Sequence, residues 1–341
     1  MRHGSRPWRS FPSPRRGHGP VVSNVPERLL RRRAQRRKEL RRRRLGALAA
    51  VVGVVLLIGV GFGVGGRGDR EGGGSAEPEA PQTTLPGGGR RIFPDRRVVA
   101  FYGAPQAAEL GVLGIGDPDQ MAKKLERQAR PYATSARPVL GAFELIAVVA
   151  ADAPGEGDLY RTRQEDAIIR RYLQAARRAG AILLLDIQPG RSDFLTEAKA
   201  LERWLREPDV GLALDPEWRM AADEVPGQTI GSVDASEVNA TSRWLSELTR
   251  RERLPQKLMV IHRFTDDMID DLAALDEPPG VATVINVDGF GSQAQKVAKY
   301  RDLESHRFHA GFKLFYEEDT GLMTPQRVLR LRPEPDLIVY E

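Results

Sequence analysis

The stretch "VGLALDPEW" (residues 210–218) joins the alternating pattern of a buried β-strand to an acidic end. Successive side chains of a strand point to opposite faces, so we expect helices to pack on the face that carries Val210, Leu212 and Leu214. The other face would point into the protein with two small residues, which leave room for a ligand, and two acids: Gly211, Ala213, Asp215 and Glu217. Pro216 cannot donate a ladder hydrogen bond, so the strand should end there.

Similar apolar runs recur along the chain and alternate with helix-like segments. Seven further runs are predicted to be strands, at residues 97–103, 138–149, 181–188, 229–235, 257–264, 281–290 and 311–318. Helical patterns lie between most of them, at residues 120–130, 163–179, 193–206, 237–251, 266–275 and 292–305. This alternation indicates an α/β protein of the (β/α)8, or TIM-barrel, class. The closing residues 335–341 are expected to add an edge strand or to pack across the barrel.

Polar residues gather where these strands end, and (β/α)8 barrels place their active sites at the C-terminal ends of their strands. The candidate catalytic residues are Glu217, Asp215, Asp288 and Asp186. The candidate substrate-binding residues are Tyr102, Trp218, His262, Arg263, Phe264 and Lys313. Each has a structural alternative, such as a capped strand end or a turn. Lys313 is expected to point inward, where its structural alternative is a buried salt bridge to Asp288 or Asp186.

The spacing of Asp215 and Glu217 suits proton transfer. Acids at i and i+2 of a strand stand about 6–7 Å apart at the backbone, and their carboxyl groups can come closer. Repulsion would then raise the pKa of one acid and keep it protonated at working pH, as a general acid requires. Trp218 offers a flat apolar surface beside them.

The charge of the chain is concentrated at its N-terminus. Residues 1–44 carry 16 Lys and Arg against two acids, and the remaining 297 residues carry 36 basic and 44 acidic groups. Residues 45–64 contain no charge, and twenty helical residues span about 30 Å, the thickness of the hydrocarbon core of a bilayer. We therefore expect an uncleaved transmembrane helix, with a cleaved signal peptide as the alternative. The basic cluster should stay cytoplasmic and leave the C-terminal domain extracellular.

These features predict four parts. They are a basic cytoplasmic tail (1–44), a single transmembrane helix (45–64), a flexible linker rich in Gly, Pro and Glu (65–96) and an extracellular (β/α)8 barrel (97–341). The chain has no cysteine, which excludes disulfides and thiol chemistry.

The D-x-E at the end of the fourth predicted strand resembles the signature of the chitinase-type family 18 glycoside hydrolases and the D-x-E of the family 25 lysozymes. In the former, the full motif reads D-G-x-D-x-D-x-E. Here Ala213 stands where the middle aspartate belongs, and "VIHRF" replaces the Tyr-x-Asp of the sixth strand. The layout that includes "GFKLFYEED" and "PDLIVYE" is similar to that of membrane-anchored proteins of actinobacteria.

The resemblance implies a membrane-anchored, extracytoplasmic glycoside hydrolase that cleaves O-glycosyl bonds of cell-envelope or environmental polysaccharide. Glu217 would be its general acid and Asp215 the partner of that acid, with Asp186 and Asp288 in support. Tyr102, Trp218 and Phe264 would be platforms for sugar rings. Because the motif is incomplete at Ala213, the alternative is a barrel that binds a cell-wall glycan without turnover.

Other chemistries are less favoured by the sequence. A mixed carboxylate and histidine set could hold a metal ion through Asp186, Asp215, Glu217, His262 and Asp288. However, the sequence lacks H-E-x-x-H and has no H-x-H on its first predicted strand, so no metal and no cofactor are predicted. The net negative charge of residues 45–341 argues against binding to nucleic acid.

Overall fold

A computed structural model of the chain describes residues 83–105 and 110–341. The predicted basic tail and transmembrane helix, and most of the predicted linker, lie outside these residues. Within the described part, no helix has the length and apolar composition needed to cross a bilayer.

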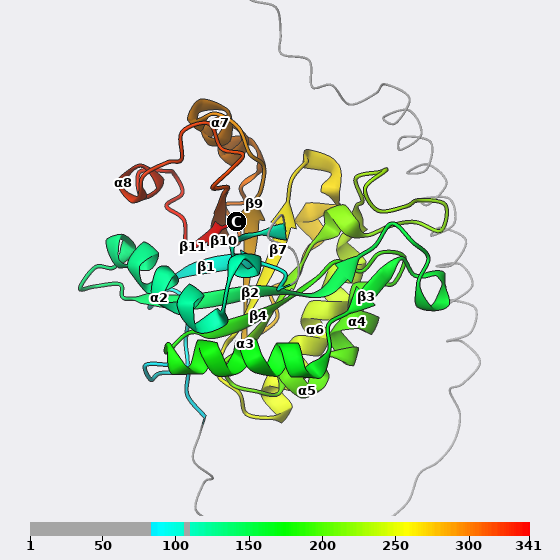
Figure 1. Cartoon of the computed structure of the whole chain (residues 1–341), viewed down its shortest axis with the longest axis horizontal. Helices are drawn as coiled ribbons and strands as arrows, with labels where there is room; N and C mark the ends of the chain where they lie inside the picture. Colours follow the sequence, from blue (N-terminus) through cyan, green and yellow to red (C-terminus); the bar gives the residue numbers. More distant parts are fainter. Residues whose placement is uncertain (1–82, 106–109) are drawn as a thin grey trace, which may run out of the picture. The chain divides into compact units, whose positions relative to one another are not determined.

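Eight parallel strands of the described residues close into a barrel, with helices outside it (Figure 1). Strand β1 pairs with both β2 and β11, which completes the ring, so the predicted (β/α)8 class is confirmed. The barrel strands are β1 (Arg97–Gly103), β2 (Val139–Ala150), β4 (Ile182–Ile187), β5 (Val210–Leu214), β7 (Lys257–Arg263), β9 (Val281–Val287), β10 (His309–Leu314) and β11 (Leu337–Tyr340). A short strand, β3 (Arg161–Arg163), pairs antiparallel with the end of β2.

The helices follow the predicted pattern with one exception. They are α2 (Pro118–Ala129), α3 (Asp166–Arg178), α4 (Phe194–Ala200), α5 (Glu202–Leu205), α6 (Ala235–Arg251), α7 (Gln293–Leu303) and α8 (Pro325–Val328). The predicted helix at residues 266–275 is wrong. That stretch forms two 3-10 turns around strand β8 (Ile269–Asp270), and Asp271 has a left-handed backbone with φ of 60°.

The identity of one barrel strand also differs from the prediction. Residues 229–235 contribute only β6 (Val233–Asp234), which pairs with β8 outside the barrel. This stretch is poor in aliphatic residues, and the Asp234 side chain accepts a hydrogen bond from the Ser236 N–H as the N-cap of α6. The eighth barrel strand is instead β11, whose four residues are all buried between β1 and β10.

The alternation of side chains produces two apolar layers. Inward residues such as Ala213, Val260 and Val339 fill the lower part of the barrel, while outward residues such as Leu212 and Leu214 pack under the helices. The predicted faces of β5 are therefore confirmed. Gly211 leaves no room for a ligand, however, because a Cβ there would lie 2.7 Å from a methyl group of Leu184 and from the Leu258 carbonyl oxygen.

The segment before β1 closes the N-terminal end of the barrel. Leu85, Ile92 and Phe93 belong to the interior apolar cluster, and the Ile92 and Phe93 N–H groups donate to Gln256 Oε1 at 2.7 and 3.2 Å. Part of the range predicted as a linker thus packs with the barrel. With this end filled, the polar chemistry of the interior lies at the C-terminal end.

Lys257, a buried lysine near the N-terminal end, makes stability depend on pH. Its Nζ donates to the Val210 carbonyl at 2.7 Å, and burial lowers its pKa to about 7 from an ordinary value of 10.5. Between these values the unfolded chain binds more protons than the folded one, so stability should rise with pH. The slope for one proton is at most about 1.4 kcal/mol per pH unit.

Urea unfolding at several pH values should show this slope, and Lys257→Met should remove it. The exposed control Lys124→Met should keep it, and an unchanged slope in Lys257→Met would contradict the prediction.

Candidate functional site

The imidazole of His262 lies at the centre of the upper barrel and is hydrogen-bonded on both sides. His262 is an inward residue of β7 and only 1% exposed. Its Nδ1 lies 2.9 Å from Asp288 Oδ2, and its Nε2 lies 2.8 Å from Glu144 Oε1. Burial alone would lower the pKa of His262, but the charges of Asp288 and Glu144 outweigh it and raise the pKa well above its ordinary value. Without another ligand, the ring is therefore a cation that donates to both carboxylates.

Lys313 provides the second cation. Its Nζ lies 3.2 Å from Asp288 Oδ2, 2.7 Å from Glu341 Oε2 and 3.7 Å from the centre of the Tyr102 ring. Burial favours the neutral form of Asp288, but His262 and Lys313 together lower the pKa of Asp288 to about 2. The predicted salt bridge between Lys313 and Asp288 is confirmed.

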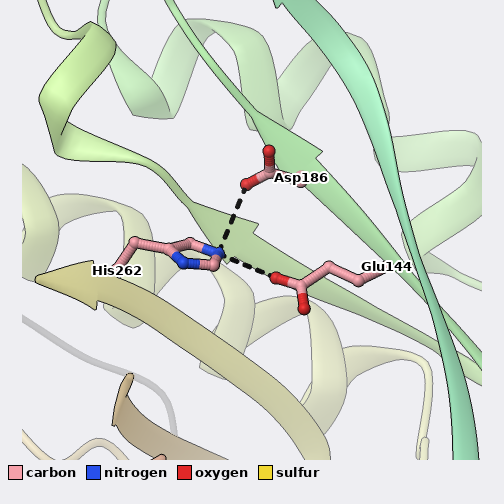
Figure 2. Close-up of side chains that lie close together, drawn as sticks. All are labelled: Glu144, Asp186 and His262. Carbon is pink, nitrogen blue, oxygen red and sulfur yellow. Dashed lines mark hydrogen bonds and ion pairs between the residues drawn. The ribbon is translucent and has the colours of Figure 1, made fainter. Parts of the chain in front are cut away.

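Asp186 and Glu144 approach His262 from neighbouring strands, β4 and β2 (Figure 2). Asp186 Oδ1 lies 3.9 Å from His262 Nε2, and Asp186 Oδ2 accepts a hydrogen bond from the Tyr102 hydroxyl at 3.3 Å. Burial and the charge of Glu144 raise the pKa of Asp186 to about 7, although His262 opposes them. One oxygen of each acid, Glu144 Oε2 and Asp186 Oδ1, is buried without a hydrogen-bond partner among the described residues.

Asp215 and Glu217 reach the same region, although not from one strand. Strand β5 ends at Leu214, and Glu217 lies on a 3-10 turn, Pro216–Trp218. Burial and then the charge of Glu217 raise the pKa of Asp215 well above its ordinary value. Burial and then the charge of Asp288 raise the pKa of Glu217. Asp215 is 4% exposed, whereas Glu217 is only partly buried.

A distant glycine supports the turn that carries Glu217. The Gly231 N–H donates to the Glu217 carbonyl at 2.5 Å. A Cβ at Gly231 would lie 2.6–2.7 Å from the carbonyl oxygens of Pro216, Glu217 and Arg219. Only a residue without a side chain fits this close approach.

The structure brings all four predicted catalytic acids together. We use the name mouth cluster for eight ionisable side chains at the C-terminal end of the barrel: Glu144, Asp186, Asp215, Glu217, His262, Asp288, Lys313 and Glu341. Tyr102 lies against this cluster through its contacts with Asp186 and Lys313.

The remaining predicted binding residues lie outside the cluster. Arg263 points away from the barrel interior, because it follows the inward His262, and it donates to the Leu303 carbonyl at 2.6 Å and to Asp266 at 2.7 Å. Phe264 is partly buried beneath the Lys299 ammonium, which lies 4.0 Å from its ring centre. Trp218 is partly buried on the turn beside Glu217.

The sequence analysis did not choose three residues that belong to the mouth cluster or bond to it: Glu144, Asn286 and Glu341. Glu144 is an acid within an otherwise apolar run of twelve residues, which is a usable signal. Asn286 donates to Asp288 Oδ1 at 2.5 Å and precedes it by two positions, the spacing of one strand face. Glu341 could not be recognised, because β11 was not assigned to the barrel.

No family model and no curated protein matches the chain. Solved structures found to be similar include the wild-type sialic acid aldolase of Ruminococcus gnavus, at 10% identity and a TM-score of 0.34 over 72% of this chain and 68% of that one. The catalytic lysine mutant of that aldolase matches at 10% identity and a TM-score of 0.35 over 74% and 68%. Oxaloacetate acetylhydrolase in complex with the inhibitor 3,3-difluorooxalacetate matches at 11% identity and a TM-score of 0.29 over 72% and 67%.

The prediction of a glycoside hydrolase that cleaves O-glycosyl bonds, with a glycan-binding barrel as its alternative, is corrected. The D-x-E differs physically from the pattern it resembled, because Glu217 follows the strand on a turn and Ala213 belongs to the apolar interior. The similar structures reported above are an aldolase and an acetylhydrolase. Matches with TM-scores this low assign no activity to the chain.

Removal of Lys313 tests the charge balance of the mouth cluster. Lys313→Met leaves Asp288 and Glu341 without a shared cation, and breaking a buried pair from one side costs about 3–5 kcal/mol. The matched variant is Lys299→Met at the edge of the mouth, whose contact with Phe264 is worth about 1 kcal/mol or less. Urea unfolding at pH 7 measures both. Equal losses in the two variants would contradict the prediction.

Proposed function

We propose that the chain is an enzyme that uses general-acid catalysis on a small polar substrate at the C-terminal mouth of its barrel. The observation that supports this most is the pair of acids with raised pKa values, Asp215 and Glu217, close to a charged imidazole and a charged lysine. Clusters of perturbed acids occur preferentially at functional sites, although structural ion networks also produce them.

Glu217 is the proton donor in this proposal. It is the more accessible of the two acids, so a substrate can reach it, and its raised pKa keeps the carboxyl group protonated to higher pH. Such a group can protonate an oxygen or nitrogen that gains negative charge in the transition state. The pKa of Asp215 is raised further, so its neutral carboxyl group does not repel the Glu217 carboxylate after the transfer.

The charge of the mouth cluster limits the substrate. The cluster contains six carboxyl groups, of which Asp215 and Glu217 are neutral in this proposal, and two cations, His262 and Lys313, that are already bonded to the carboxylates Glu144, Asp288 and Glu341. An anionic substrate would therefore meet repulsion, whereas a neutral or cationic polar molecule would not.

The test measures turnover of a panel of neutral and cationic esters, amides and carbonyl compounds. For a substrate that the wild type converts, Glu217→Gln should lower kcat/KM by about 10²–10⁴-fold, the usual contribution of a general acid. The rate of the wild type should also fall as pH rises through the raised pKa of Glu217, and this limb should be absent in the variant. Glu317→Gln, which changes an exposed acid shortly after β10, is the control and should keep full activity. Full activity of Glu217→Gln, or no turnover of any compound by the wild type, would contradict the proposal.

We also propose that residues 45–64 anchor the protein in the cell membrane with its N-terminus cytoplasmic and its barrel outside. The support is the uncharged run of twenty residues directly after residues 1–44, which carry 16 Lys and Arg. In intact cells, protease added from outside should remove a C-terminal tag but spare an N-terminal one. The reverse pattern, or recovery of the full chain outside the membrane fraction, would contradict this. The absence of nucleic-acid binding stays a prediction.

A further inference from the structure

We propose that Glu144, Asp186 and His262 form a binding site for one divalent transition-metal cation inside the upper barrel. Each residue offers one ligand atom, and these atoms lie within 4.8 Å of one another. Figure 2 shows both carboxylates turned toward the same ring nitrogen of His262. This inference concerns the buried side of the mouth cluster and goes beyond the proposed role of Glu217.

The distances suit an ion after small movements. His262 Nε2 lies 2.8 Å from Glu144 Oε1 and 3.9 Å from Asp186 Oδ1. Nitrogen and oxygen ligands stand about 2.0–2.2 Å from such a cation, which places neighbouring ligand atoms roughly 3 Å apart. The first distance already agrees with this, and the second and the overall spread of up to 4.8 Å need the two carboxylates to close in by about 1–2 Å.

The unpartnered oxygens point independently to a ligand. Glu144 and Asp186 are both 0% exposed, and Glu144 Oε2 and Asp186 Oδ1 accept no hydrogen bond from any described residue. A buried acceptor without a partner costs about 1–3 kcal/mol, more when it is charged, so native structures rarely leave one. A cation between the two acids would satisfy Asp186 Oδ1, which faces His262 Nε2, and rotation of the Glu144 carboxylate would bring Glu144 Oε2 to the same ion (Figure 2).

The opposite side of the His262 ring is arranged as metal sites usually arrange it. Asp288 binds Nδ1 and is itself bonded by Lys313 and Asn286. A carboxylate on one ring nitrogen fixes the proton there and leaves the other nitrogen to the metal. Binding of the cation would then release the Nε2 proton. The hydrogen bond between Nε2 and Glu144 would be replaced by one bond from each of them to the ion.

The ligand types define the class of ion. Calcium and magnesium prefer oxygen ligands alone, whereas one imidazole with two carboxylates suits Mn²⁺, Fe²⁺ or Zn²⁺. A divalent cation also balances the charge of two buried carboxylates, whereas a protonated His262 balances only one of them.

The experiment measures binding of Mn²⁺ to the purified full-length chain after treatment with a chelator. Titration calorimetry should give one tight site per chain, with Ca²⁺ a weak competitor. Glu144→Gln and Asp186→Asn should abolish this site, and Asp288→Asn should weaken it by about 10–100-fold, as outer-sphere changes do. The control is Glu197→Gln, which changes an equally buried glutamate outside the barrel that binds Arg161 and Arg163. Glu197→Gln should keep the site.

A spectroscopic measurement keeps the test decisive if a variant fails to fold. Pulsed electron paramagnetic resonance of Mn²⁺ bound to the wild type should show coupling to an imidazole nitrogen. Absence of a stoichiometric site, a site that both folded ligand variants retain, or bound Mn²⁺ without nitrogen coupling would each overturn the proposal. All these readouts are independent of turnover, so the metal site and the role of Glu217 can fail separately.

Discussion

The arrangement of the upper barrel depends on the double hydrogen bond of the His262 ring. This ring joins Glu144 on β2 to Asp288, directly after β9, across the buried interior of the barrel. Buried carboxylates repel one another strongly, and a cation placed between them offsets this repulsion. Lys313 plays the same role on the opposite side of Asp288 and extends the network to Glu341.

The strand alternation explains why this network lies above an apolar plug. Several barrel strands contribute inward residues that are aliphatic near the start and polar near the end, as Val260 and His262 illustrate on β7. The aliphatic layer and the segment with Ile92 and Phe93 exclude water from below. Low polarity beneath the cluster strengthens every charge interaction within it, and burial is accordingly the first cause of the raised pKa values of Asp186 and Asp215.

Much of this architecture could be predicted from local patterns, and the failures have physical causes. Seven of the eight predicted strands form barrel strands, because apolar runs bounded by turns are a local signal. The stretch 229–235 was misassigned since Asp234 within it caps α6. Residues 335–341 were expected at an edge or across the barrel, and the place of β11 inside the ring was missed because its pairing with β1 joins residues far apart in the chain. The four acids were found from their place after strands. The partners of each nitrogen of His262 could not be found, because they depend on the stagger between strands rather than on any single strand.

The close packing of Gly231 against the turn of Glu217 has a consequence for protein engineering. Gly231 contacts the backbone of the turn at Pro216, Glu217 and Arg219, so both ends of the loop that joins them are held in place. Loop grafts that aim to alter selectivity would have to start after Met220, which is buried and donates to the Gly190 carbonyl, and finish before Gly231. Between these two fixed ends, the sequence of the loop can be exchanged without moving the turn that carries Glu217.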